Sequence, residues 1–114
     1  MPNFIIEHSE SLLEQVSLEI LQDAVFEGAK NSGHFPPEAI KIRTEGRKHF
    51  RLHGQQKDFL HIKGHILSGR TDAQKKEISQ AVMLPLTQLK LNSVFVSVEI
   101  IDIHRESFVD FSYS

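Results

Sequence analysis

The residue with the clearest chemical potential in this sequence is Pro2, which directly follows the initiating methionine. Bacterial-type processing usually removes a methionine that precedes proline, and its loss would leave the secondary amine of Pro2 as the amino terminus. An α-amino group titrates near pH ~8, and burial or a neighbouring cation lowers that pKa, so a fixed amine can serve as a general base. The apolar run Phe4-Ile5-Ile6 predicts a strand that would fix it in place. Many ordinary proteins also begin with Met-Pro, so the remainder of the chain has to support a catalytic role.

The positive charges are concentrated in the middle of the chain. Residues 41–76 hold ten of the 13 lysines and arginines but only three of the 15 acidic residues, which gives this segment a charge of +7 against −9 elsewhere. Such an excess predicts either an anion-binding site, for phosphate or carboxylate groups, or a solvated basic hairpin.

The histidines of the basic segment have a spacing that can suit a metal ion: His49 with His53, and His61 with His65. Such a pair can share an ion on a helix, but both pairs lie in predicted strands, where four residues span ~13 Å. We therefore expect no metal site and a partly solvated sheet face. A cross-strand pair of His53 and His61 stays open as an alternative.

Length and composition predict a single domain over residues 1–114, with 39% hydrophobic and 25% charged residues. No apolar run approaches the ~20 residues that cross a membrane, and no secretory signal pattern is visible. The absence of cysteine excludes disulfides and thiolate chemistry. The expected setting is therefore the cytoplasm, with no membrane contact.

The periodicity of the apolar residues predicts two β-α-β units, over about residues 1–57 and 58–114. The first has a helix that Ser17 caps and that ends before Gly33, followed by a strand at residues 39–44. The second has a strand at residues 59–67, a helix that begins with a capping box at residues 71–74, and a strand that begins at Ser93. The predicted class is α+β, a four-stranded mixed sheet with two helices on one face.

Four further expectations follow from local patterns. Residues 50–53 resume the strand alternation and form a hairpin with residues 59–67, and Pro85 breaks or kinks the second helix near Leu84. The sheet face without helices still carries apolar side chains, so another subunit is expected to cover it. The aromatic tail at residues 108–113 is expected to dock on a neighbouring subunit.

An ordered set of motifs runs through nearly the whole chain. Its parts are Met-Pro-x-Phe-Ile-x-Glu at residues 1–7, Gly33-x-Phe35-Pro36, Phe59 through Gly69-Arg70, Ser97-x-Glu99-Ile100, and His104. In this set the chain resembles the 5-carboxymethyl-2-hydroxymuconate isomerase family of the tautomerase superfamily. The resemblance implies a duplicated β-α-β fold, a homotrimer, a role in aromatic compound catabolism and no cofactor. It also implies a small unsaturated oxo or hydroxy carboxylate as substrate, with Pro2 as the amino-terminal base of a keto–enol shift.

The resemblance also indicates which residues would bind the substrate. Guanidinium groups can bind carboxylates and stabilise a developing enolate. Arg70 is the first candidate for this role, because the helix N-terminus beside it also attracts anions. Arg43 comes next, and His61 matches the family and could line a pocket. The family tends to place an arginine where this chain has Lys41, which keeps the charge but loses the bidentate geometry.

Two other functions fit the same element order. A βαββαβ chain with a basic middle could be an RNA-binding module, although only Phe59 and Phe95 are candidates for base stacking. A non-catalytic trimeric relative with a binding or regulatory role is the other alternative. The preferred partners remain a small carboxylate and two further copies of the chain, without nucleic acid.

Overall fold

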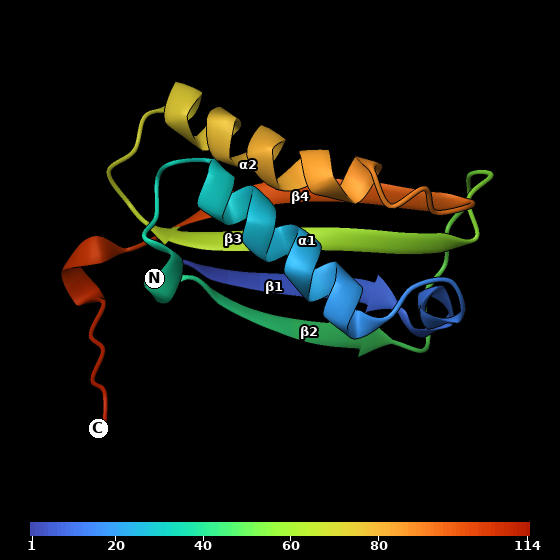
Figure 1. The fold of residues 1–114 in the computed structure, drawn as a ribbon, viewed down its shortest axis with the longest axis horizontal. Helices are drawn as coiled ribbons and strands as arrows, with labels where there is room; N and C mark the ends of the chain where they lie inside the picture. Colours follow the sequence, from blue (N-terminus) through green and yellow to red (C-terminus); the bar gives the residue numbers. More distant parts are fainter.

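Strand β1 lies inside a four-stranded sheet whose strands follow the order β2-β1-β3-β4. The structure is a computed structural model that describes residues 1–114. Its strands are β1 (Asn3–Ser9), β2 (Lys41–Arg47), β3 (Asp58–Leu67) and β4 (Val94–Ile103), and its helices are α1 (Leu18–Asn31) and α2 (Asp72–Thr87). Three short 3-10 helices, η1 (Glu10–Glu14), η2 (Pro37–Ala39) and η3 (Arg105–Ser107), complete the order. Both helices lie on one side of the sheet (Figure 1).

The topology consists of two β-α-β units joined at the middle of the sheet. β1 pairs with β2 in parallel and β3 pairs with β4 in parallel, while β1 and β3 pair antiparallel. A helix crosses between the two strands of each parallel pair, as parallel pairing requires. The α+β class and the mixed sheet predicted from the sequence are confirmed.

The predicted hairpin is wrong. β2 and β3 lie on opposite sides of β1, so they cannot pair with each other. The crossover through α1 returns the chain beside β1, and residues 48–57 then pass across the sheet's end to reach its other side. Residues 50–53 lie in this loop and form no strand, and His53 consequently has no strand from which to face His61.

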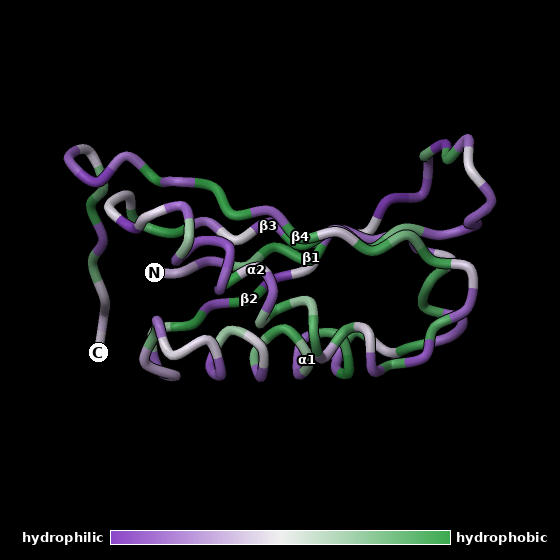
Figure 2. The backbone as a smooth tube through the Cα atoms, turned by 90° about the horizontal axis from the view of Figure 1, so that it is seen from above, coloured by the Kyte–Doolittle hydropathy of each residue, from purple (hydrophilic) through white to green (hydrophobic).

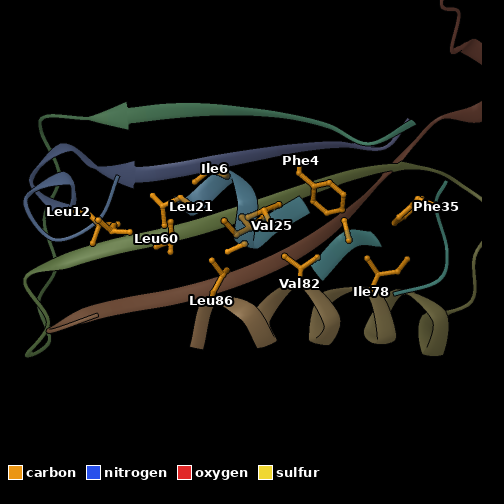
Figure 3. Packing of buried hydrophobic residues seen from close by; sticks show 14 of the residues in the cluster. Phe4, Ile6, Leu12, Leu21, Val25, Phe35, Leu60, Ile78, Val82 and Leu86 are labelled. Carbon is orange, nitrogen blue, oxygen red and sulfur yellow. The ribbon is translucent and has the colours of Figure 1, made fainter. Parts of the chain in front are cut away.

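The core lies between the sheet and the helices. Even-numbered residues of β1 and β3 point into it, including Phe4, Ile6 and Leu60, which are fully buried. Each helix contributes a stripe of apolar side chains, such as Leu21 of α1 and Val82 of α2 (Figure 3). Full burial of one such side chain contributes about 1.5–3 kcal/mol. When each residue is coloured by hydropathy, hydrophobic (green) stretches occur in the strands and in the helices, alternating with hydrophilic (purple) ones (Figure 2).

Both helices begin as the sequence predicts. The Ser17 side chain accepts a hydrogen bond from the Ile20 amide (3.2 Å), and Thr71 and Gln74 form a full capping box. The predicted break at Pro85 is wrong, because α2 continues to Thr87. Pro85 cannot donate a helical hydrogen bond, but only Leu86 and Thr87 of the helix follow it, and the burial of Leu86 holds this last turn on the core.

Two glycines allow close packing. A Cβ on Gly28 of α1 would lie 2.6 Å from both the Ala81 carbonyl oxygen and the Val82 Cα of α2. The backbone of α2 therefore approaches α1 directly at this point. A Cβ on Gly64 of β3 would lie 2.8 Å from the Phe4 ring, so glycine leaves the space that this ring occupies.

The open face of the sheet is formed by the odd-numbered residues of all four strands, and it is more charged than predicted. Arg47 forms ion pairs with Glu7 (2.8 Å) and Glu45 (3.1 Å), and Lys63 lies 3.6 Å from Glu7. Apolar side chains such as Phe95, which is 57% exposed, are interspersed. The sequence predicted apolar side chains on this face, and the structure places them among charged ones.

Beyond η3 the chain leaves the body of the molecule as an extended tail (Figure 1). Phe111 and Tyr113 pack only edge to face against each other, with ring centroids 5.1 Å apart, and both are more than three-quarters exposed. Neither α1 nor α2 has the length and apolar character that a membrane span demands.

Candidate active site

Pro2 lies at the start of the strand inside the sheet and is fully buried. Its carbonyl oxygen accepts a hydrogen bond from the Lys41 amide (3.1 Å), which extends the pairing of β1 and β2 by one residue. The next core residue, Phe4, packs edge to face against Phe35 with centroids 6.2 Å apart. The hydrogen bond to Lys41 and the packing of the neighbouring Phe4 on Phe35 together fix the position of Pro2.

A cavity of about 130 Å³ opens beside Pro2, at the end of the sheet where β1 begins and β3 and β4 end. It combines apolar walls with two cationic side chains, and its lining residues are Met1, Pro2, Phe35, Ile66, Leu67, Arg70 and Arg105. Pro2 and Arg70, which the sequence indicated as candidate site residues, both line this cavity, together with Phe35.

Arg70 follows β3 and is held by two contacts. Its Nη2 donates a hydrogen bond to the His34 carbonyl oxygen (3.0 Å), and its guanidinium lies over the Phe35 ring, 4.8 Å from the centroid. A guanidinium has five N–H donors, so the hydrogen bond to His34 leaves donors for an anion. The side chain is therefore oriented in advance for binding a carboxylate or an enolate oxygen.

Arg105 is a cavity residue that the sequence interpretation missed. It stands in η3, immediately after β4, and its Nε donates to the Ser68 carbonyl oxygen (2.9 Å). The parallel register pairs Leu67 with Ile103, which brings the segments after β3 and β4 side by side. Arg105 lies near Arg70 because of this register. The sequence pattern did not predict how β3 and β4 are aligned, so it could not predict this neighbour.

The charges around the amino terminus favour a neutral amine. Burial lowers the pKa of the Met1 amino group from its usual value, and the positive charge of Lys41 lowers it further, while Asp110 acts in the opposite direction. Lys41 is exposed at the start of β2, where its Nζ also donates to the Ala39 carbonyl oxygen (3.4 Å). An amine in this environment loses its proton at a lower pH than an exposed one.

Arg43 and His61 lie on the open face and do not line the cavity. Arg43 stands beside Ile5 in the register of β1 and β2 and is exposed. The Nδ1 of His61 lies 2.6 Å from the Ser97 hydroxyl, and its Nε2 lies 2.5 Å from the Glu99 carboxylate. Both residues thus occupy the surface that the helices leave uncovered.

A larger hollow of about 470 Å³ lies between the outer sides of α1 and α2. It is lined by Ile20, Asp23, Ala24, Glu27, Asn31, Pro85, Gln88 and Leu89, none of them basic. Two carboxylates and no cation make it unsuitable for an anionic substrate, so the smaller cavity is the better candidate.

The family model of 5-carboxymethyl-2-hydroxymuconate isomerase matches residues 2–106 of the chain. No functionally curated protein matches it.

Solved structures share the fold. A 5-carboxymethyl-2-hydroxymuconate isomerase from Deinococcus radiodurans R1 is 22% identical, with a TM-score of 0.78 over 98% of this chain and 90% of that one. A 5-carboxymethyl-2-hydroxymuconate delta-isomerase is 15% identical, with a TM-score of 0.73 over 98% and 89% of the two chains. A fused 4-OT wild-type asymmetric trimer is 19% identical, with a TM-score of 0.72 over 95% and 91%. At these identities the likeness establishes the tautomerase-type fold.

Proposed function

Because the chain belongs to the 5-carboxymethyl-2-hydroxymuconate isomerase family, and is an isomerase, we propose that it catalyses a keto–enol 1,3-proton shift. The proposed substrate is a small unsaturated hydroxy or oxo carboxylate such as 5-carboxymethyl-2-hydroxymuconate. The observation that carries the proposal is the shared cavity of Pro2 and Arg70, an amine position and a guanidinium around one apolar hollow.

In the proposed mechanism Met1 is removed and the Pro2 nitrogen is the general base. The neutral amine takes the hydroxyl proton of the enol, the oxygen becomes a carbonyl, and the resulting ammonium returns a proton to a carbon of the conjugated chain. One group can do both because the two atoms lie on the same small molecule. Arg70 binds the carboxylate and offers charge-assisted hydrogen bonds to the oxygen on which negative charge develops.

We propose that Lys41 keeps the amine neutral and attracts the anionic substrate. Its charge already lowers the pKa of the amino group at this end of the chain. As a lysine it acts as a point charge and not as a bidentate fork, so its contribution to binding should be smaller than that of Arg70.

The proposed assembly is a homotrimer of this single domain, with the open sheet faces turned toward a three-fold axis. Related folds include symmetric and asymmetric 4-OT trimers, and this chain leaves one sheet face and an aromatic tail uncovered. Arg43 and His61 would contribute to a substrate site through such an assembly, because they lie on the face that meets the next subunit. Light scattering should give three times the chain mass of 13.0 kDa at micromolar concentration, and a monomer would contradict the assembly.

The RNA-binding alternative has weaker support. Phe59 and Phe95 are adjacent in the register of β3 and β4 on the open face. The same face carries Glu7, Glu45 and Glu99, whose charges repel phosphates. We therefore propose that this mixture of acidic and basic side chains does not bind nucleic acid.

The experiment that tests the function is turnover of 2-hydroxymuconate by the processed protein, followed by ultraviolet absorbance. Arg70→Ala should lower kcat/KM at least about tenfold, the scale of a charge-assisted hydrogen bond. Arg51→Ala is the matched control, because exposed Arg51 belongs to the loop 48–57. The loop that joins β2 to β3 lies at the end of the sheet opposite the amino terminus (Figure 1). Absence of turnover would contradict the enzymatic proposal and favour a non-catalytic binding relative.

A further inference from the structure

The cavity beside Pro2 contains two guanidinium groups and no carboxylate. Arg70 comes from the segment that follows β3, and Arg105 comes from η3 after β4. Neither takes part in an ion pair, whereas Arg47 on the open face is paired with Glu7 and Glu45. The cavity lining therefore holds two guanidinium groups that are not paired with a carboxylate, and Asp110, a carboxylate at this end of the molecule, acts on the Met1 amino group.

The position of Arg105 is set by the backbone. The Ser68 amide donates to the Ile103 carbonyl oxygen (3.0 Å), and the Arg105 amide lies 3.4 Å from the Ser68 hydroxyl. The Arg105 Nε then donates to the Ser68 carbonyl oxygen (2.9 Å). Three hydrogen bonds thus join the two segments and fix the direction of the guanidinium.

The terminal nitrogens of Arg105 remain available. Its Nη2 lies over Gly69, 3.6 Å from where a Cβ would be, so no side chain stands between them. Glu106, the neighbouring carboxylate, lies 3.4 Å from His104 instead. A guanidinium held through Nε presents its two outer N–H groups as a fork for a carboxylate.

We propose that Arg105 is a specificity-determining residue that binds a second carboxylate of the substrate. This inference rests on the proposed function, in which Arg70 binds the carboxylate next to the reacting oxygen. Arg105, exposed at the mouth, takes the carboxylate at the far end of the conjugated chain. A monocarboxylate leaves Arg105 without a partner and binds less tightly.

Two unreactive probes test the inference, trans,trans-muconate and sorbate. Both are six-carbon dienoates, and they differ in that one end is a carboxylate in muconate and a methyl group in sorbate. Calorimetry on the processed protein should show muconate binding at least about tenfold tighter, the scale of one charge-assisted hydrogen bond. Arg105→Gln should remove this preference by weakening muconate alone.

Further variants separate Arg105 from its neighbours. Arg70→Gln should weaken both probes, since both retain the first carboxylate. Arg51→Gln should change neither. Arg105→Lys should keep part of the preference, because lysine supplies charge without the fork, and it provides a second variant if Arg105→Gln does not fold.

The inference is wrong if the unmutated protein binds both probes equally or fails to bind muconate. It is also wrong if Arg105→Gln leaves the preference intact or weakens both probes alike. A preference that depends on Arg105 in a protein without 2-hydroxymuconate turnover would uphold the binding role and refute the proposed reaction. Turnover of 2-hydroxymuconate without a preference for muconate would uphold the proposed reaction and refute the binding role of Arg105.

Discussion

At the scale of single residues, the most informative feature is the environment of the amino terminus. Burial and the Lys41 charge both lower the pKa of the Met1 amino group, and we expect the same surroundings to lower the pKa of the Pro2 amine once Met1 is removed. Because only a neutral amine can accept a proton, kcat/KM should rise with pH through a midpoint below ~8, the value for an exposed α-amino group.

Lys41→Gln tests the cause of that shift. Removal of the cation should raise the pKa of the amine, so the midpoint of the kcat/KM profile should move to higher pH and activity at pH 6 should fall. Lys76→Gln, an exposed lysine of α2 that does not line the cavity, is the control. Identical profiles for all three proteins would exclude Lys41 as a determinant of the pKa.

The sequence predicted part of this site. Pro2 and Arg70 were indicated as site residues, and they share the cavity with Phe35. Arg105 could not be found in that way, because its place depends on the register of β3 and β4. Arg43 and His61 were expected in the same site, but strand alternation directs them to the open face, which became evident only when the pairing was known.

At the scale of the elements, α1 and α2 pack so closely at Gly28 that no methyl group fits between them. Gly28→Ala would place a methyl group 2.6 Å from the Ala81 carbonyl oxygen and the Val82 Cα, both backbone atoms that cannot yield without moving a helix. Overpacking of this kind typically costs about 1–3 kcal/mol.

Urea denaturation should show that loss for Gly28→Ala. Gly54→Ala is the control, since its Cβ would meet only the end of the Gln56 side chain, at 3.3 Å, in an exposed loop. Equal urea midpoints for the two variants would mean that the helices can move apart with little loss of stability, which would contradict the prediction.

Local signals predicted the elements better than their arrangement. Ser17 and the Thr71 capping box identified both helix starts, because caps depend on neighbouring residues. The hairpin prediction was wrong because the crossover through α1 places β2 on one side of β1 and leaves the other side to β3. The break at Pro85 was wrong because burial of Leu86 outweighs one missing hydrogen bond.

At the scale of the whole molecule, the charged open face makes stability depend on pH. The hydrogen bond from Arg47 lowers the pKa of the Glu7 carboxyl, with help from the Lys63 charge and against some burial. A lowered pKa means that the folded state binds the proton less readily than the unfolded chain. The stabilisation is therefore full above the unfolded pKa of about 4.3 and lost as pH falls through the lower folded value.

Glu7→Gln should then have a lower Tm than the unmutated protein at pH 7, and the two curves should converge by pH 2–3. Glu14→Gln, an exposed residue of η1 without an ion pair, is the control. A Tm difference that persists at the acid end would assign the effect to packing and not to the charge.

The central claim is that the amine of Pro2 is the base, and the most direct test relates activity to the removal of Met1. With Met1 attached, the Pro2 nitrogen is a tertiary amide without a basic lone pair, and Met1 itself lines the cavity. Preparations with graded removal of Met1, quantified by intact mass, should convert 2-hydroxymuconate at rates proportional to the processed fraction. Equal specific activity in fully processed and Met1-bearing protein would contradict the account.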